Sequence, residues 1–327
     1  MKPFLRKLFV NLGVCDVLRA FNRAPRILFY HSIDDCTDNM VGMFTTSVSD
    51  FTKEIDYFQK KFEIISLEEF ENRFRNKCFT NNELVLTFDD GFANALRNVY
   101  PVLSQRNIPY TVFISTDHID SGEFFPTTIN RMIFYHGGRD TISVPTLEKE
   151  FSFKNEGERM NALMEVAVAL KTSGPQRVKS IVKDLINNVS QEEWHSLQQK
   201  FSSEIPMTWE EVKSLSDSGV TIGAHCKEHI SVVDSVPEDV ICDEIVGSKQ
   251  IIETRLQKEC RYFAYPSGHM SQCAIDCVAS NFAMGFTTKS EEKITYETNT
   301  SCIPRIMTGR TLEDVKVFTS EYPQLKR

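Results

Sequence analysis

Two acidic residues side by side at the end of an apolar segment could carry metal or acid–base chemistry. Asp89 and Asp90 follow the apolar run Leu84–Phe88 and precede Gly91. Adjacent side chains at the end of a strand diverge, so one carboxylate can bind a metal ion while the other accepts a proton. A capping turn is the simpler interpretation, because Asp and Gly are common in turns.

Two histidines four residues apart end a second apolar segment. His225 and His229 follow Val220–Ala224, and this spacing is typical of zinc ligands. The residue after His225 is Cys226, which excludes the HExxH motif of metalloproteases because that motif needs glutamate there. We expect Cys226 to point away from the histidine pair and to fill space in the core.

A third apolar segment, Tyr262–Tyr265, runs into Pro266, Ser267 and Gly268. Such a rigid turn can expose backbone N–H groups, which can form an oxyanion hole without help from side chains. Taken alone, these three residues indicate only a turn.

Strands and helices must bring these polar segments together, and the pattern of apolar residues predicts where those strands and helices lie. Short apolar runs bounded by polar residues predict buried parallel strands, with helices between them. The predicted strands are Arg26–Tyr30, Leu84–Phe88, Tyr110–Ser115, Val220–Ala224, Tyr262–Tyr265 and Ala283–Thr287, and the predicted helices are Ser49–Lys61 (capped by Asp50), Phe92–Gln105, Thr208–Ser216 and Val240–Leu256. The alternation predicts an α/β fold with a mainly parallel sheet. In a parallel barrel the C-terminal ends of the strands meet at one face, so the polar segments would share one site.

We expect one domain over residues 25–327, interrupted by a helical insertion at about 122–205. That segment shows mostly helical periodicity and contains no cluster of metal-ligand residue types.

Residues 1–24 predict an amphipathic helix. Apolar residues recur there at helical spacing among five basic residues and one acid, Asp16; the apolar residues are Phe4, Leu5, Leu8, Phe9 and Leu12. The helix either packs against the body of the fold or rests on an anionic membrane surface. Lys and Arg interrupt the apolar run and no small-residue cleavage site follows, so we expect no signal peptide.

Composition excludes several classes of protein. The chain has 327 residues, 41% of them hydrophobic, which is enough for a sizeable core. Its net charge of −8 argues against a nucleic-acid binder. No apolar run approaches the length of a membrane span. The nine Cys are scattered without a CxxC pair, which argues against a disulfide framework and fits the cytoplasm.

The three motifs occur in an order that resembles a known family. Thr87–Gly91 (TFDDG), then His225 and His229, then Phe263–Gly268 (FAYPSG) resemble the NodB-homology polysaccharide deacetylases, carbohydrate esterase family four. The resemblance extends to FYHS at Phe29–Ser32, typical of the glycan-biosynthesis branch, and to segments Asn107–Phe113 and Thr208–His225.

This resemblance implies a distorted (β/α) barrel of about seven strands with one divalent metal ion. Carried over by position, Asp90, His225 and His229 would be its ligands and Asp89 the general base. Zinc is the first choice of metal, with cobalt, nickel or manganese as alternatives. The backbone N–H of Ser267 would help to stabilise developing negative charge, and Tyr265, Pro266 and Gly268 would contact substrate.

The sequence departs from the family pattern at three points. The residue after His229 is Ile230, where the family often has Pro. Ala264 replaces the arginine that orients the catalytic aspartate; Arg305 is our preferred substitute and Arg261 the alternative. The C-terminal Leu-x-His motif, which supplies the general acid, is absent. His31 and His269 are the candidates for that role, whereas His118, His136 and His195 are expected at the surface.

The leading hypothesis is therefore a metal-dependent deacetylase that removes the N-acetyl group from an acetylated amino sugar in a polysaccharide or glycan precursor. Two alternatives remain: an O-acetyl esterase or other C–N hydrolase on the same site, and a catalytically inactive carbohydrate-binding protein. We expect the protein in the cytoplasm. The N-terminal helix could also place it at the inner surface of the membrane.

Overall fold

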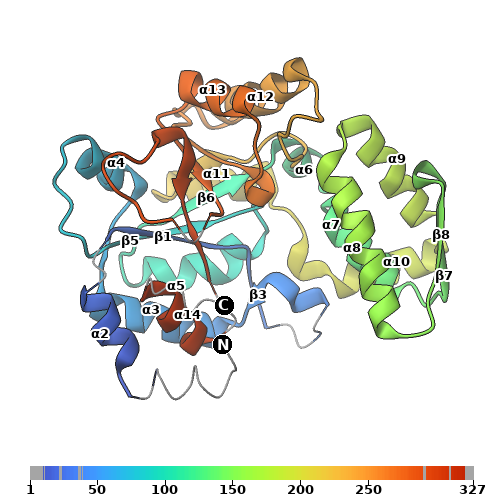
Figure 1. Cartoon of the computed structure of the whole chain (residues 1–327), viewed down its shortest axis with the longest axis horizontal. Helices are drawn as coiled ribbons and strands as arrows, with labels where there is room; N and C mark the ends of the chain where they lie inside the picture. Colours follow the sequence, from blue (N-terminus) through green and yellow to red (C-terminus); the bar gives the residue numbers. More distant parts are fainter. Residues whose placement is uncertain are drawn as a thin grey trace.

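The computed structural model describes residues 10, 12–21, 24–35, 38, 40–289, 292–308 and 311–320. Its centre is a set of parallel strands that curve into a nearly closed barrel (Figure 1). In spatial order the strands are β12 (Ile303–Pro304), β11 (Met284–Thr287), β10 (Tyr262–Ala264), β9 (Thr221–Ala224), β6 (Thr111–Ile114), β5 (Glu83–Phe88), β1 (Arg26–Tyr30) and β13 (Ile306–Met307). The short β4 (Glu63–Ile64) pairs with β5 outside this path.

The two edges of the sheet come from one interrupted strand. β12 pairs with β11, β13 pairs with β1, and only Arg305 separates them in the chain. Counted as one broken strand, they give seven strands around the barrel. The predicted distorted (β/α) barrel is therefore confirmed, and all six apolar runs form strands within it.

Side chains alternate along each strand between the barrel interior and the surrounding helices. Phe113, Tyr262 and Phe286 pack together inside the barrel. Leu86, Val112 and Phe263 belong to the larger cluster between strands and helices. Those helices are α3 (Val48–Lys61), α5 (Tyr100–Ser104), α6 (Thr116–Ser121), α11 (Trp209–Asp217), α12 (Glu238–Leu256), α13 (Gln272–Asn281) and α14 (Leu312–Thr319). A further helix, α4 (Leu67–Arg75), instead contributes Leu67, Phe70 and Phe74 to the cluster that contains Phe113.

Two details of the predicted helices are corrected. Ser47, not Asp50, caps α3, because the Ser47 side chain accepts the N–H of Asp50 at 3.0 Å. The segment after β5 is not one regular helix, since a π-helical turn at Ala95–Val99 precedes α5.

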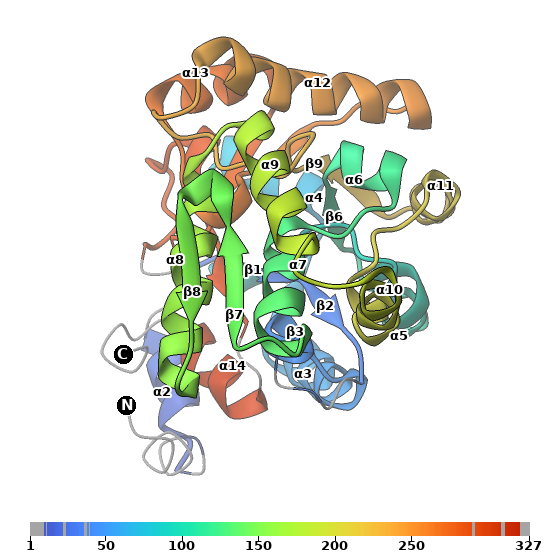
Figure 2. The same cartoon turned by 90° about the vertical axis from the view of Figure 1, so that its right-hand side faces the viewer.

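An insertion between β6 and β9 stands beside the barrel, at the right of Figure 1, and faces the viewer in Figure 2. It contains α7 (Pro126–Arg131), a π-helical turn (Met132–His136), α8 (Glu156–Thr172), α9 (Pro175–Ile186) and α10 (Gln191–Lys200), which surround a hydrophobic cluster of their own. An antiparallel hairpin, β7 (Thr141–Val144) with β8 (Lys149–Ser152), also belongs to it and was not predicted. Its strands are only four residues long, which is too short for alternation to stand out from helical periodicity.

Half of the predicted N-terminal helix, including residues 1–9, lies outside the described residues. The described part, α2 (Val14–Phe21), packs Cys15 against Val317 of α14. This contact favours packing against the fold over membrane contact for that part. Among the described residues, no helix combines the length and apolarity that a membrane crossing requires. A second small sheet pairs β2 (Ser32–Ile33) with β3 (Thr45–Thr46).

Candidate metal centre

Asp90, His225 and His229 converge at the C-terminal face of the barrel. One potential ligand atom from each lies within 4.8 Å of the others. The Nε2 atoms of His225 and His229 lie 3.5 Å and 3.2 Å from Oδ1 of Asp90. Asp90 follows β5 and the histidines follow β9, so two strands separated by β6 supply the cluster.

The cluster fits a divalent metal ion. Ligands at about 2.0–2.1 Å in a tetrahedral arrangement lie about 3.4 Å from one another, close to the two distances between Asp90 and the histidines. Oδ1 of Asp90 is buried and has no hydrogen-bond partner among the described residues. Burial opposes ionisation of Asp90, but the two neighbouring histidines, His229 first, outweigh it and hold its pKa well below the usual range. An ionised, otherwise unsatisfied carboxylate is the form that a cation binds.

A backbone carbonyl group orients the His225 ring so that Nε2 faces the cluster. Its Nδ1 lies 2.7 Å from the carbonyl oxygen of Ala264, at the end of β10. A carbonyl only accepts, so Nδ1 carries the proton and a neutral His225 presents the lone pair of Nε2.

A buried glutamate on α12 holds the loop between the two histidines. Oε2 of Glu244 accepts the backbone N–H groups of Lys227 and Glu228 at 3.0 and 2.9 Å. Burial raises the pKa of Glu244 to about 7. Sequence reasoning missed Glu244, because an acid in the middle of a long polar helix gives no sign that it faces inward.

The backbone at this face is strained. Asp90, Cys226, His229 and Ser267 all have positive φ, between 54° and 72°. Residues other than glycine seldom adopt this conformation, and where they do the cost is offset elsewhere, often at functional sites. The Cys226 side chain is fully buried in the core, as expected.

Arg305 and Asp89 form a buried ion pair beside the cluster. Both guanidinium Nη atoms donate to the two carboxylate oxygens of Asp89 at 2.7 Å, and Nη1 also donates to Oγ1 of Thr87 at 3.0 Å. Burial alone would raise the pKa of Asp89, but the charge of Arg305 lowers it below the ordinary value. The alternative candidate, Arg261, pairs instead with Glu71.

Ser267 and His31 lie at the cavity that contains these residues. The cavity has a volume of about 300 Å³, and its wall includes both residues together with Asp89, Asp90, His225 and His229. The His31 ring lies between the rings of Phe29 and Phe44, at 5.6 and 5.4 Å. His269 is exposed and does not line this cavity.

Tyr265, predicted to contact substrate, does not present its side chain to the cavity. Tyr265 is fully buried and packs against Phe263, at 5.1 Å between ring centroids, in the layer between strands and helices. It shares the direction of Phe263, two residues earlier, and that direction leads away from the barrel interior. Pro266 is also buried, and Gly268 forms the left-handed turn after Ser267 without lining the cavity.

His118 was expected at the surface but is buried behind His229. Phe125 separates the two, with ring centroids 4.1 Å from His118 and 5.0 Å from His229. Burial lowers the pKa of His118 to about 4, so it is neutral near pH 7.

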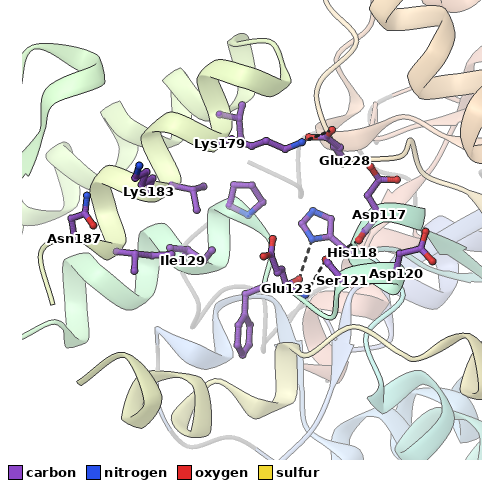
Figure 3. Close-up of a pocket in the computed structure, with 15 residues that line it drawn as sticks. Asp117, His118, Asp120, Ser121, Glu123, Ile129, Lys179, Lys183, Asn187 and Glu228 are labelled. Carbon is purple, nitrogen blue, oxygen red and sulfur yellow. Dashed lines mark hydrogen bonds and ion pairs between the residues drawn. The ribbon is translucent and has the colours of Figure 1, made fainter. Parts of the chain in front are cut away.

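A larger hollow of about 720 Å³ lies between α6 and α9 (Figure 3). Lys179 of α9 reaches across it to Glu228, with a distance of 2.9 Å between Nζ and Oε1. None of Asp89, Asp90, His225 and His229 lines this hollow. The smaller cavity therefore remains the candidate site.

Comparison with solved structures shows the same fold in several bacterial deacetylases. The Streptococcus pyogenes deacetylase PplD in complex with acetate has a TM-score of 0.59 at 16% identity, over 89% of this chain and 96% of that one. IcaB from Ammonifex degensii gives 0.57 at 17% identity, over 91% and 98%. The BpsB deacetylase domain from Bordetella bronchiseptica gives 0.53 at 16% identity, over 87% and 96%.

No curated protein matches the chain. A family model described as polysaccharide deacetylase matches residues 76–161 and 173–283, more than half of its length. The matched residues include Asp89, Asp90, His225, His229 and the turn at Ser267. With this match and the barrel in agreement, the chain belongs to the polysaccharide deacetylases of the NodB-homology family, hydrolases that act on carbon–nitrogen bonds in carbohydrates.

Proposed function

We propose that this protein is a metal-dependent deacetylase that removes the N-acetyl group from an acetylated amino sugar in a glycan or glycan precursor. The observation that carries the proposal is the convergence of Asp90, His225 and His229 beside the Asp89–Arg305 pair. Asp90, His225 and His229 would hold one divalent ion, with zinc favoured by the one-oxygen, two-nitrogen ligand set. When bound, such an ion activates water and polarises the substrate carbonyl.

The chain's own groups supply the proton transfers. Asp89 stays ionised near neutral pH, and its carboxylate has lone pairs beyond those that Arg305 occupies, so it can accept the proton of the attacking water. Arg305 fixes the direction of this carboxylate through two parallel hydrogen bonds. The leaving amine needs a proton, and His31, at the cavity wall, is our candidate donor. The backbone N–H of Ser267 is our candidate donor to the developing oxyanion.

Metal content and acetate release test this proposal together. We expect purified protein to hold one divalent ion per chain and to release acetate from N-acetylated sugars supplemented with zinc, cobalt or nickel. His225→Ala should lose both the ion and activity. Asp89→Asn should keep the ion and lose turnover by about 10²–10⁴-fold, the usual contribution of a general base. His195→Ala is the matched control, because His195 is exposed on α10 and contacts Gln199.

The same assays separate the alternatives. If acetate is released faster from O-acetylated than from N-acetylated sugars, the protein is an O-acetyl esterase and not an N-deacetylase. A chain that binds the ion but releases acetate from neither class would be the inactive carbohydrate-binding protein. An absence of metal binding in the unaltered protein would contradict the proposed site itself.

A further inference from the structure

Exposed apolar side chains gather at the mouth of the cavity that holds the candidate metal centre. Among the described residues, seven large hydrophobic side chains are exposed, and three of them line this cavity: Phe44 (48%), Met164 (54%) and Met307 (49%). A fourth, Val168 (57%), lies one helical turn beyond Met164 on α8. We call Phe44, Met164, Val168 and Met307 the apolar rim.

The apolar rim is assembled from three separate parts of the chain. Phe44 ends the 3-10 turn Val41–Phe44, Met307 ends β13, and Met164 and Val168 belong to the insertion. The register of β1 with β13 places Met307 opposite Phe29, which also lines the cavity. Leu163 and Ala167 continue the apolar lining along α8. Isolated exposed apolar residues are ordinary, but a group around one opening indicates a binding surface.

The inner wall of the same cavity is polar. Asn130 of α7 is buried, its Nδ2 donates to the carbonyl oxygen of Leu163 at 3.0 Å, and its Oδ1 has no hydrogen-bond partner among the described residues. Arg131 and Glu204 form a buried ion pair beside it, and Thr128 donates to Glu204 at 2.6 Å. Polar side chains along this wall suit the hydroxyl groups of a sugar.

We propose that the substrate is amphiphilic: an acetylated amino sugar that carries an apolar group, such as an alkyl or lipid chain. This inference rests on the proposed function and names the class of its substrate. The sugar would lie against the polar wall with its acetamide at the metal centre, and the apolar group would leave the cavity across the apolar rim. Each methylene group buried against these four side chains stabilises the complex, and an alkyl chain offers far more apolar surface for this than the rings of a polysaccharide do.

Matched glycosides test the inference by binding and by turnover. We would measure calorimetric binding of the methyl and octyl glycosides of N-acetylglucosamine to the full chain, below the micelle concentration of the octyl compound, with the N-acetylglucosamine tetramer as the polymer probe. Acetate release from the same compounds gives kcat/KM. We expect the octyl glycoside to bind at least tenfold more tightly than the methyl glycoside, which requires about two buried methylene groups.

Substitutions in the apolar rim test whether these side chains cause the preference for the octyl glycoside. The double variant Met164→Ser, Val168→Ser should bring the octyl-to-methyl binding ratio close to one. Phe21→Ser is the matched control, because Phe21 is 83% exposed on α2 and outside the cavity wall, and it should keep the ratio.

Three results would overturn the inference. They are equal binding of the two glycosides, tighter binding of the tetramer than of the octyl glycoside, and a shift in oligomeric state of the rim variant, which would make the rim an interface between copies. Absence of acetate release with an intact octyl preference would instead contradict the proposed function and support the inference.

Discussion

Arg305 interrupts the strand that closes the barrel, and its side chain lies fully buried among aromatic rings. Its guanidinium carbon is 4.8 Å from the ring centroid of Phe29 and 5.3 Å from that of Phe113. A buried cation in such surroundings is stable only with a well-placed partner, and Asp89 is that partner. The same pair therefore contributes to stability and fixes the direction of the carboxylate that we propose as the general base.

Arg305→Lys separates these two contributions. Lysine keeps the positive charge but cannot form two parallel hydrogen bonds, so we expect kcat to fall by about tenfold or more with little change in KM or metal content. Arg305→Ala leaves Asp89 buried and unpaired, and should lower the free energy of unfolding by about 3–5 kcal/mol. Steady-state kinetics and denaturant titration check both variants. Unchanged kcat in Arg305→Lys would remove Arg305 from the positioning of Asp89.

At the scale of elements, the loop from β9 to α12 carries both histidines and depends on α12 for its shape. Glu244 accepts two successive N–H groups of this loop, between the two histidines. Its neighbour Asp243 instead pairs with the side chain of Lys227, at 2.9 Å from Nζ. Glu244 thus binds the backbone of the loop, whereas Asp243 binds only a side chain of it.

We expect Glu244→Ala to weaken metal binding by about 10–100-fold, because groups that orient metal ligands typically contribute that much. Asp243→Ala, one residue earlier and exposed, should leave the metal affinity unchanged. Competition with a chromophoric chelator gives the affinities, and far-ultraviolet circular dichroism checks that the fold is kept. Equal affinities in the two variants would show that the loop holds its shape without Glu244.

The insertion is a second element-level feature with a direct effect on the site. It supplies part of the cavity wall, including Asn130 and Arg131 from α7 and Met164 from α8. Its hydrophobic cluster is separate from those of the barrel, so its surface can change without disturbing the strands that hold Asp90 and the histidines. The cavity wall is therefore shared between the insertion and the barrel, and the barrel alone carries Asp89, Asp90 and the two histidines.

For the molecule as a whole, a buried acid links stability to pH. Glu54 of α3 is fully buried in the main core, where Oη of Tyr30 donates to its Oε2 at 2.7 Å. Burial raises the pKa of Glu54 from 4.5 to about 8. Between these values the unfolded chain releases the proton that the native state keeps, so stability falls as pH rises from about 4.5 to 8.

Glu54→Gln removes this dependence, since the amide stays neutral and can still accept from Tyr30. The free energy of unfolding of the variant, relative to that of the unaltered protein, should increase by about 2–4 kcal/mol from pH 5 to pH 8. The increase is at most ~1.4 kcal/mol for each pH unit. Denaturant titrations at four pH values measure the difference. Asp56→Asn, on the same helix but exposed, is the control. Parallel stability curves for Glu54→Gln and the unaltered protein would show that Glu54 is ionised in the native state.

The sequence by itself determined the strands and the motifs at their ends. Apolar runs such as Arg26–Tyr30 and Leu84–Phe88 are buried on both faces of the sheet, so their composition alone identifies them. The residues Asp89, Asp90, His225 and His229 could be chosen because polar groups directly after such runs must lie at the same face of a parallel barrel.

Only the tertiary structure decided the remaining parts of the site. The sequence offered both Arg305 and Arg261 as partners of Asp89, and the structure selects Arg305, which reaches Asp89 across 216 residues of chain. Asn130, Glu244 and Met164 reach the site from helices whose patterns show no such role. Tyr265 faces away from the cavity because alternation along β10 places it with Phe263 in the helix-facing core. Sequence patterns record which residues are near one another along the chain and which are apolar; which side chains meet depends on strand register and helix packing, which are contacts between distant segments.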